Sequence, residues 1–300
     1  MNVAAIDMGT NSVRLLIINE RGQELVRRMQ ITRLGQGVDH SGALSEEAIA
    51  RTLAVLESFR AELDCLHVSR VRATATSAAR DASNSSLFFD SVEAVLGHRP
   101  ELISGDEEAL LSFQGATKNL ASDIPPPFLI IDIGGGSTEF ALGTDRPEQL
   151  VSVPMGCVRM TERHFKSDPP TTDEIATCVR DVQRVLRQQV LPAIDVQRAR
   201  TVLGLAGTIS SFAHMNLNLT QYDGKRTQHS RLSLARTTEL QQQLLSQDAA
   251  GRRKLLAEPK RAEVIVGGAV VLVTIMRELS IDSMLVSESD ILDGLAASLR

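Results

Sequence analysis

Two short segments of this 300-residue chain share one pattern, and this repeat restricts the fold more than any other feature. Each segment is an apolar run that ends in Asp-x-Gly, followed by a small polar turn that reaches a serine and then by a second apolar run. The copies span residues 5–12 and 130–137, and aligning Asp7 with Asp132 also aligns the following glycine and serine. A strand–turn–strand element that occurs twice indicates a duplicated fold with a cleft between the two copies.

The remaining patterns place this repeat in an α/β protein, because predicted strands and helices alternate through most of the chain. Strands are predicted at 3–7, 13–19, 68–74, 128–131 and 201–206. Amphipathic helices are predicted to begin after Ser45 and after Thr171, which forms a capping box with Glu174. The apolar run Val264–Met276 is shorter than the roughly 18 residues of a membrane span and is expected to form a buried helix. The proline run at 125–127 marks the predicted domain boundary.

The composition excludes several classes of function. The chain has 32 Lys and Arg against 37 Asp and Glu, which gives a formal net charge of −5. Coating nucleic acid or an anionic membrane requires a broad cationic surface, and stacking on bases requires aromatic side chains, which make up only 3% here. We therefore expect no nucleic-acid or membrane partner, so that any anionic ligand must be held in a confined site.

The cysteines and the N-terminus point to a reduced, cytoplasmic setting. The three cysteines, at 65, 157 and 178, have no close spacing, so neither a disulfide framework nor a zinc cluster is predicted. Asp7 lies where a signal peptide would need an apolar core. These features predict a cytoplasmic protein.

The repeated turn has the chemistry of a phosphate site. Glycine-rich turns expose successive backbone N–H groups, and the hydroxyls of Thr10, Ser12, Ser137 and Thr138 add further donors. The Asp before each turn would repel phosphate but suits Mg²⁺, which favours one or two carboxylates plus phosphate oxygens. The alternative is an ordinary hairpin whose Gly and Asp serve the turn alone. Two copies in matched context favour the phosphate site.

With Ala206, Gly207 and Thr208 as a third element, the two turns resemble the phosphate and nucleoside loops of the actin, sugar-kinase and Hsp70 ATPase superfamily. More narrowly, the chain resembles the exopolyphosphatase and guanosine pentaphosphate phosphohydrolase (Ppx/GppA) family. The segments that carry this resemblance cover nearly the whole chain in order: IDMGTNSVRL (6–15), RLGQG (33–37), ATSAARDASN (75–84), ISGDEEA (103–109), DIGGGSTE (132–139), PMGCVR (154–159) and RAE (261–263).

The resemblance implies two RNase H-like domains of the actin-like (ASKHA) fold, with the active site in the cleft between them. The first domain is expected to comprise residues 1–124 together with a C-terminal helix at 290–300 that packs back on it. The second domain is expected to span residues 125–289. By analogy, a homodimer is also expected.

The resemblance implies a role for each matching residue. Glu108 corresponds to the family's catalytic glutamate, Arg80 corresponds to an arginine that contacts the reacting phosphate, and Glu139 is a further candidate. Asp7 and Asp132 fit the positions that bind Mg²⁺ or Mn²⁺. The residues expected to line the two phosphate loops are Gly9, Thr10, Asn11, Ser12, Gly134, Gly135, Gly136, Ser137 and Thr138.

Two departures from the family pattern stand out. Leu110 occupies a position where the family commonly has Arg, so that one cationic contact is missing, and Arg14, Arg33 and Arg159 are the candidates to compensate. The helical domains that longer members carry after the second domain have no counterpart before Arg300. We therefore expect a minimal two-domain member that holds long polymers less firmly.

Three functions remain open at this point. The first is an exopolyphosphatase that releases orthophosphate from the end of inorganic polyphosphate and requires Mg²⁺. The second is a phosphohydrolase that converts pppGpp to ppGpp with the same apparatus. The third is a non-catalytic binder of polyphosphate or ppGpp, which the missing arginine at position 110 would suit. A kinase of the same superfamily would need an acceptor pocket, and a client-binding ATPase would need a client segment, of which none is evident. Both are disfavoured because the motifs are closer to those of the phosphohydrolases, with Glu108 in the expected place.

Overall fold

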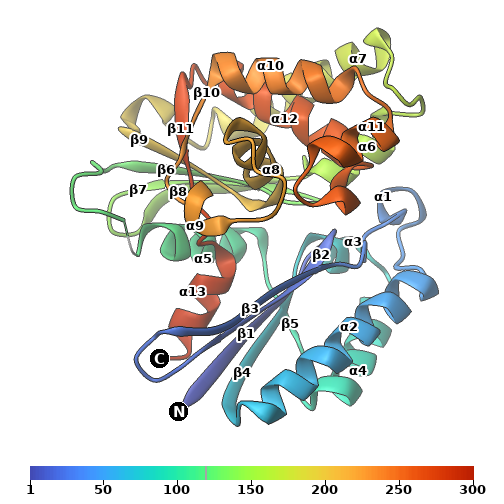
Figure 1. The fold of residues 1–300 in the computed structure, drawn as a ribbon, viewed down its shortest axis with the longest axis vertical. Helices are drawn as coiled ribbons and strands as arrows, with labels where there is room; N and C mark the ends of the chain where they lie inside the picture. The colour runs from blue at the N-terminus through green and yellow to red at the C-terminus, as the bar shows by residue number, and fades with distance from the viewer. Residues whose placement is uncertain (119) are drawn as a thin grey trace.

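The computed structural model describes residues 1–118 and 120–300, which form two halves, each built on one β-sheet (Figure 1). The first half contains β1 (Asn2–Met8), β2 (Ser12–Ile18), β3 (Glu24–Ile31), α1 (Val38–Ser41), α2 (Glu46–Cys65), β4 (Val68–Ala75), α3 (Ser77–Asp81), α4 (Ser85–Leu96), β5 (Glu101–Leu102) and α5 (Gly105–Thr117). The predicted caps are confirmed, since the Ser45 side chain accepts from Ala48 N and Thr171 forms its capping box with Glu174.

The second half continues with the same alternation of strands and helices. Its elements are β6 (Phe128–Ile133), β7 (Thr138–Gly143), β8 (Pro147–Val153), α6 (Cys157–His164), α7 (Thr172–Val185), the π-helix η1 (Leu186–Val190), the 3₁₀ turn η2 (Val196–Arg198), β9 (Thr201–Leu205), α8 (Ala206–Asn216), α9 (Gly224–Thr227), β10 (Arg231–Ser233), α10 (Leu234–Leu245), α11 (Ala249–Leu255), the 3₁₀ turn η3 (Pro259–Arg261), α12 (Ile265–Glu278), β11 (Ser283–Val286) and α13 (Ile291–Ser298).

The two sheets have the same topology. The first has the order β3-β2-β1-β4-β5, and the second has the order β8-β7-β6-β9-β11, with β10 added at its edge. In both, the first three strands in the chain are antiparallel neighbours and the fourth runs parallel to the first. The predicted α/β class with two RNase H-like domains is thereby confirmed. The repeated sequence pattern forms the β1–β2 and β6–β7 hairpins, in which Asp7 lies opposite Arg14 and Asp132 lies opposite Glu139.

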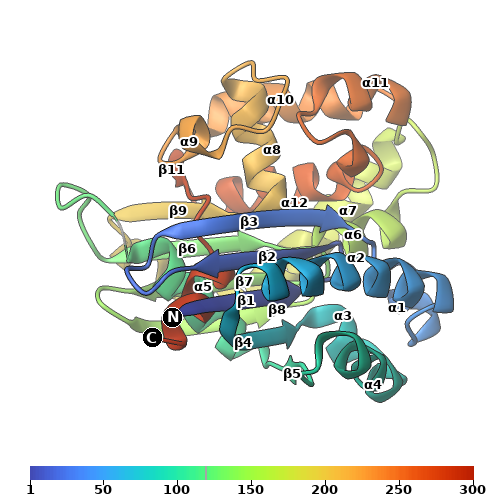
Figure 2. The same cartoon turned by 60° about the horizontal axis from the view of Figure 1, so that its bottom comes forward.

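Each sheet is covered by helices on both faces. The apolar side chains of α2 and α4 pack on one face of the first sheet, and α13 packs on the other. The core of the second sheet includes α7, α8, α10 and α12 on one face and α5 on the other. Figure 2 shows α8, α10 and α12 on the side of β6 and β9 away from α5.

The helix α12 confirms the buried helix expected at 264–276. All its residues from Ile265 to Met276 are buried. Within residues 1–118 and 120–300, no helix combines the length and the apolar character that crossing a membrane would require.

The helices α5 and α13 each pack against the sheet of the opposite half. Phe113 of α5, which precedes the proline run, packs in a core formed mostly by the second sheet, whereas Leu111 of the same helix faces the core that α13 shares with β1 and β2. The helix α13 follows the last strand of the second sheet but packs on the first. The two halves are therefore joined by a pair of crossing helices, and the limits expected for the domains (1–124 with 290–300, and 125–289) stay a prediction.

The crossing brings the backbones of these helices into direct contact. A Cβ atom at Gly115 of α5 would lie 1.8 Å from the carbonyl oxygen of Asp290, and one at Gly294 of α13 would lie 2.2 Å from the carbonyl oxygen of Leu111. Both distances are far below a van der Waals contact, and the obstacles are backbone atoms that cannot rotate away. Only glycine at both positions permits this approach.

We expect Gly115→Ala and Gly294→Ala to destabilise the protein by at least about 2 kcal/mol each, because the added methyl group must push the two helices apart. In an unobstructed helix the same change stabilises by up to about 1 kcal/mol, so the sign itself is diagnostic. Chemical denaturation measures the free energy of unfolding. Gln114→Ala, on the exposed side of α5, is the matched control and should leave that free energy nearly unchanged. Stabilisation by either glycine variant would contradict the crossing.

Candidate active site

The two repeated turns face each other and touch. A Cβ atom on Gly135 would lie 2.8 Å from the Cβ atom of Thr10, and one on Gly136 would lie 2.7 Å from the Oγ1 atom of Thr10 and 2.5 Å from the Oγ atom of Ser77. Glycine in the second turn therefore allows the first turn to approach its backbone. Residues of both turns line one small cavity.

This cavity, of about 70 Å³, is lined by most of the predicted site residues, which come from four separate segments of the chain. The predicted residues that line it are Asp7, Gly9, Thr10, Asn11, Ser12, Glu108, Asp132, Gly134, Gly135, Gly136, Ser137, Ala206 and Gly207. The remaining predicted residues, Arg80, Thr138, Glu139 and Thr208, do not line it. Thr138 is buried and donates its hydroxyl to Met155 O at 2.6 Å, so this hydroxyl is engaged within the protein.

Several buried polar atoms in this site have no hydrogen-bond partner among the described residues. They are Asp7 Oδ1, Thr10 Oγ1 and both polar side-chain atoms of Asn11. An unsatisfied buried polar group costs about 1–3 kcal/mol, so a folded protein rarely leaves several together without a purpose. Their concentration between two glycine-rich turns indicates a site that a polar ligand completes.

Glu108 and Arg80 form an ion pair at the edge of the cavity. Arg80 Nη1 donates to Glu108 Oε2 at 2.8 Å and to the carbonyl of Ile103 at 3.1 Å. The side chain of Arg80 is only 21% exposed and that of Glu108 only 13%. Burial raises the pKa of Glu108 to about 7, an effect that Arg80 reduces and that the charges of Asp7 and Asp132 reinforce. A carboxylate with a pKa near neutrality is suited to accept a proton.

Two further carboxyl groups near the site, those of Asp132 and Glu139, also have raised pKa values. Burial raises the pKa of Asp132 to about 6; the charge of Asp290 reinforces the shift, and Arg14 and a hydrogen bond from Ser112 Oγ at 2.8 Å reduce it. Glu139 is 2% exposed and accepts from Ser152 Oγ at 2.7 Å. Burial, followed by the charges of Glu108 and Asp132, holds the pKa of Glu139 well above its ordinary value.

The predicted metal position fits the residues present in part. Within residues 1–118 and 120–300, no group of three or more His, Cys, Asp or Glu side chains is arranged to hold a metal ion. Asp7 nevertheless has one buried oxygen without a partner, and its charge acts on Asp132. Because Mg²⁺ takes few protein carboxylates and completes its shell with water and phosphate oxygens, these two aspartates suit an ion whose other ligands are water in the free protein.

Three residues of the site, Arg14, Asp290 and Arg261, are not among the site residues predicted from the sequence, where Arg14 is considered only as a substitute for the arginine missing at Leu110. Arg14 and Asp290 form an ion pair beside Asp7, and Arg261 lies so close to Gly207 that a Cβ atom there would be 2.0 Å from its Cζ atom. All three line the site or the adjoining cavity of about 280 Å³. The position of Arg14 opposite Asp7 follows from the hairpin and was available in the sequence. Asp290, 283 residues away from Asp7, gives no such signal.

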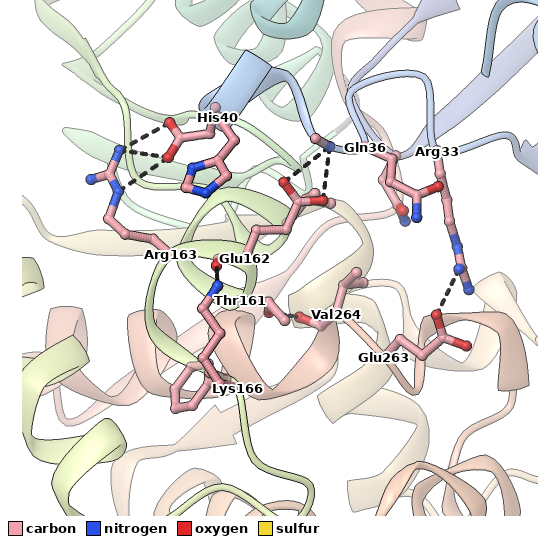
Figure 3. Close-up of a pocket in the computed structure, with 14 residues that line it drawn as sticks. Arg33, Gln36, His40, Thr161, Glu162, Arg163, Lys166, Glu263 and Val264 are labelled. Carbon is pink, nitrogen blue, oxygen red and sulfur yellow. Dashed lines mark hydrogen bonds and ion pairs between the residues drawn. The ribbon is translucent and has the colours of Figure 1, made fainter. Parts of the chain in front are cut away.

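A larger cavity of about 530 Å³ adjoins the site at Asn11, and contacts between the halves surround it (Figure 3). Arg163 donates to Asp39 at 3.0 Å, and Gly37 N donates to Glu162 Oε1 at 3.1 Å. Arg33 pairs with Glu263 at 2.6 Å. The two halves are thus held together across the cleft on this side.

The three arginines considered as substitutes for the one missing at Leu110 are all paired with carboxylates. Arg14 pairs with Asp7 and Asp290, Arg33 pairs with Glu263, and Arg159 pairs with Asp39 and Asp81. Compensation by any of them would require these pairs to rearrange.

The raised pKa of Glu139 predicts a stability effect with a definite sign. A carboxyl group that ionises less readily in the folded state makes the fold less stable as the pH rises above the pKa that this group has in the unfolded chain. We therefore expect Glu139→Gln to stabilise the protein at pH 8 relative to wild type, because the glutamine carries no charge that folding must bury. The gain should vanish below about pH 4.5.

Denaturation of both proteins across pH 4–8, without divalent cations, measures this difference. Glu57→Gln, on the exposed surface of α2, is the control and should show no gain that grows with pH. A gain for Glu139→Gln that is equal at pH 4 and pH 8 would contradict the assignment.

Known proteins resemble this chain along its whole length. Exopolyphosphatase 2 of Mycobacterium tuberculosis is 43% identical to it over 317 aligned positions, which cover 99% of this chain and 98% of that protein. A crystal structure of an exopolyphosphatase-like protein superimposes with a TM-score of 0.96 at 36% identity, covering 100% and 98% of the two chains. The Ppx/GppA enzyme of Aquifex aeolicus gives a TM-score of 0.81 at 30% identity and 99% coverage of both.

The model of one protein family, described as the Ppx/GppA phosphatase family, matches residues 16–299. This match and the relatives above agree with the topology of the two sheets and with the resemblance found in the sequence. The chain belongs to the Ppx/GppA phosphatase family.

Proposed function

We propose that this protein is an exopolyphosphatase that hydrolyses the terminal phosphoanhydride bond of inorganic polyphosphate and releases orthophosphate. The observation that carries this proposal is the Arg80–Glu108 pair at the edge of a cavity lined by two glycine-rich turns. The 43% identity to Exopolyphosphatase 2 over nearly the whole chain supports the choice of substrate.

Cleavage of a phosphoanhydride bond needs a positioned water molecule, a base and compensation of charge on the transferred phosphoryl group. Glu108 is the base: it accepts a proton from the water, a role worth about 10²–10⁴ in rate. Arg80 presents a planar set of donors to the phosphoryl oxygens and holds Glu108 in place in the free protein. The backbone N–H groups of the two turns bind the remaining oxygens without adding net charge.

A divalent cation, Mg²⁺ or Mn²⁺, would be held by Asp7 and Asp132. When bound, it would offset the negative charge of the phosphate oxygens. The partnerless Oδ1 atom of Asp7 is the observation that favours this position.

A second candidate reaction is the hydrolysis of pppGpp to ppGpp. The observation that favours it is the adjoining cavity of about 280 Å³, which Ala206 and Gly207 border together with Tyr222. This cavity would accommodate a group larger than phosphate next to the loops. Inorganic polyphosphate remains the first choice because the relative that is 43% identical to this chain is named an exopolyphosphatase. Cytoplasmic location and a homodimer stay predictions and are independent of this choice.

We expect Glu108→Gln to reduce kcat by at least about 100-fold and to leave polyphosphate binding largely intact, because only the proton acceptor is lost. Phosphate release measures turnover, and calorimetry measures binding. Glu107→Gln is the matched control: Glu107 is the neighbouring residue, is 41% exposed and pairs with Arg72. Full activity of Glu108→Gln would contradict its role as base, whereas binding without turnover in the wild type would favour the non-catalytic binder.

The pH profile gives an independent test of the same residue. Since the ionised carboxylate is the active form, kcat/KM should rise with pH and level off above an apparent pKa near 7. Arg80→Gln should move this limb to higher pH, because Arg80 lowers the pKa of Glu108. If Arg80→Gln leaves the rising part of the pH profile in place, or moves it to lower pH, the Arg80–Glu108 ion pair does not lower the pKa that the profile reports.

The two candidate substrates are separated by comparing kcat/KM for polyphosphate and pppGpp under one set of conditions. We expect polyphosphate to be preferred by at least tenfold, which corresponds to about 1.4 kcal/mol of transition-state stabilisation. A higher kcat/KM for pppGpp would reverse the order of the two proposals.

A further inference from the structure

Asp290 is a buried carboxylate, and the backbone around it determines its position. It is 7% exposed and caps α13: its Oδ1 atom accepts from Leu292 N at 3.0 Å, while its own N–H donates to Asp293 Oδ2 at 3.0 Å. Its carbonyl group is the obstacle that requires glycine at position 115. The Oδ2 atom of Asp290, which the cap does not use, points to Arg14.

Arg14 connects this carboxylate to Asp7. Its Nε and Nη2 atoms both donate to Asp7 Oδ2, at 3.1 and 2.7 Å, and its Nη1 atom donates to Asp290 Oδ2. The guanidinium is therefore occupied by carboxylates on both sides. Asp7 Oδ1 receives no hydrogen bond from the described residues and is buried in the cavity.

We propose that Asp290 is a positioning residue for the divalent cation: by holding Arg14, it keeps Asp7 Oδ1 free to bind the ion. This proposal rests on the proposed role of Asp7 in metal binding. A guanidinium prefers to engage both oxygens of a carboxylate. With Asp290 present, Arg14 instead divides its donors between one oxygen of Asp7 and one oxygen of Asp290, which lies 276 residues from Arg14 in the sequence.

The charge of Asp290 acts in the same direction. Arg14 places a positive charge beside the proposed cation position, and that charge repels a divalent ion. The carboxylate of Asp290 balances it at hydrogen-bond distance within a buried site, where screening by water is weak. Neutralising Asp290 would therefore both release Arg14 and leave its charge uncompensated. Each effect weakens binding of the cation.

The test is Asp290→Asn, which preserves the shape of the side chain and the oxygen that accepts from Leu292 N. We expect this variant to bind Mn²⁺ at least about tenfold more weakly than wild type, as measured by calorimetry on the full chain without substrate. At saturating metal its kcat on polyphosphate should approach that of wild type. The variant should still fold because the cap of α13 is retained.

Asp293→Asn is the matched control. Asp293 lies on the same first turn of α13 and pairs with Arg27 at 2.8 Å, away from Arg14 and Asp7. It should lose stability but keep the Mn²⁺ affinity of wild type. A double variant that also carries Arg14→Gln should remove the metal defect of Asp290→Asn, because no guanidinium is left to be misplaced.

Three outcomes would overturn the proposal: wild-type affinity in Asp290→Asn, an equal loss in Asp293→Asn, or no binding of Mn²⁺ by the wild type. The third would also remove the metal from the proposed function. Mn²⁺ binding that depends on Asp290, in a protein that releases no phosphate from polyphosphate, would support the positioning role and contradict only the proposed substrate.

Discussion

The backbone contact between α5 and α13 is the constraint on which the rest of the structure depends. Because Gly115 and Gly294 let the two helices touch, each helix reaches the sheet of the opposite half. The first turn of α5 then presents Glu108 to the cleft, and the start of α13 presents Asp290. A wider crossing would draw these carboxylates away from the turns that surround the cavity.

This arrangement concentrates negative charge where a negative ligand is proposed to bind. Asp7, Asp132 and Glu139 are buried and Glu108 is largely so, and burial raises the pKa of each of these four carboxyl groups. Arg14 and Arg80 offset only part of that charge. A divalent cation would offset more of it, while the N–H groups of the turns would bind phosphate through dipoles rather than through net charge. A protein with a formal charge of −5 can in this way hold a polyanion in a confined site.

Much of the site could be predicted because its residues lie in contiguous motifs. The two turns, Glu108 and Ala206–Gly207 all line the cavity, and each stands in a segment that the sequence marks by its glycines or by the family pattern. Thr138 and Thr208 were included because they adjoin those motifs, yet neither lines the cavity, since a strand and a helix turn successive side chains in different directions. Arg14 was considered only as a substitute for the arginine missing at Leu110. It is instead bound to two carboxylates.

By itself, the sequence determined the duplicated α/β fold, the two glycine-rich turns and the family, because these depend on local patterns of apolar residues, glycines and caps. Only the tertiary structure decided which side chains meet. Contacts between segments far apart in the chain produce the crossing of α5 and α13 and the link from Asp7 to Asp290 through Arg14. Such contacts also pair Arg33 and Arg159 with carboxylates. Local sequence patterns do not specify which distant segments meet, because the packing of whole helices and sheets determines these contacts.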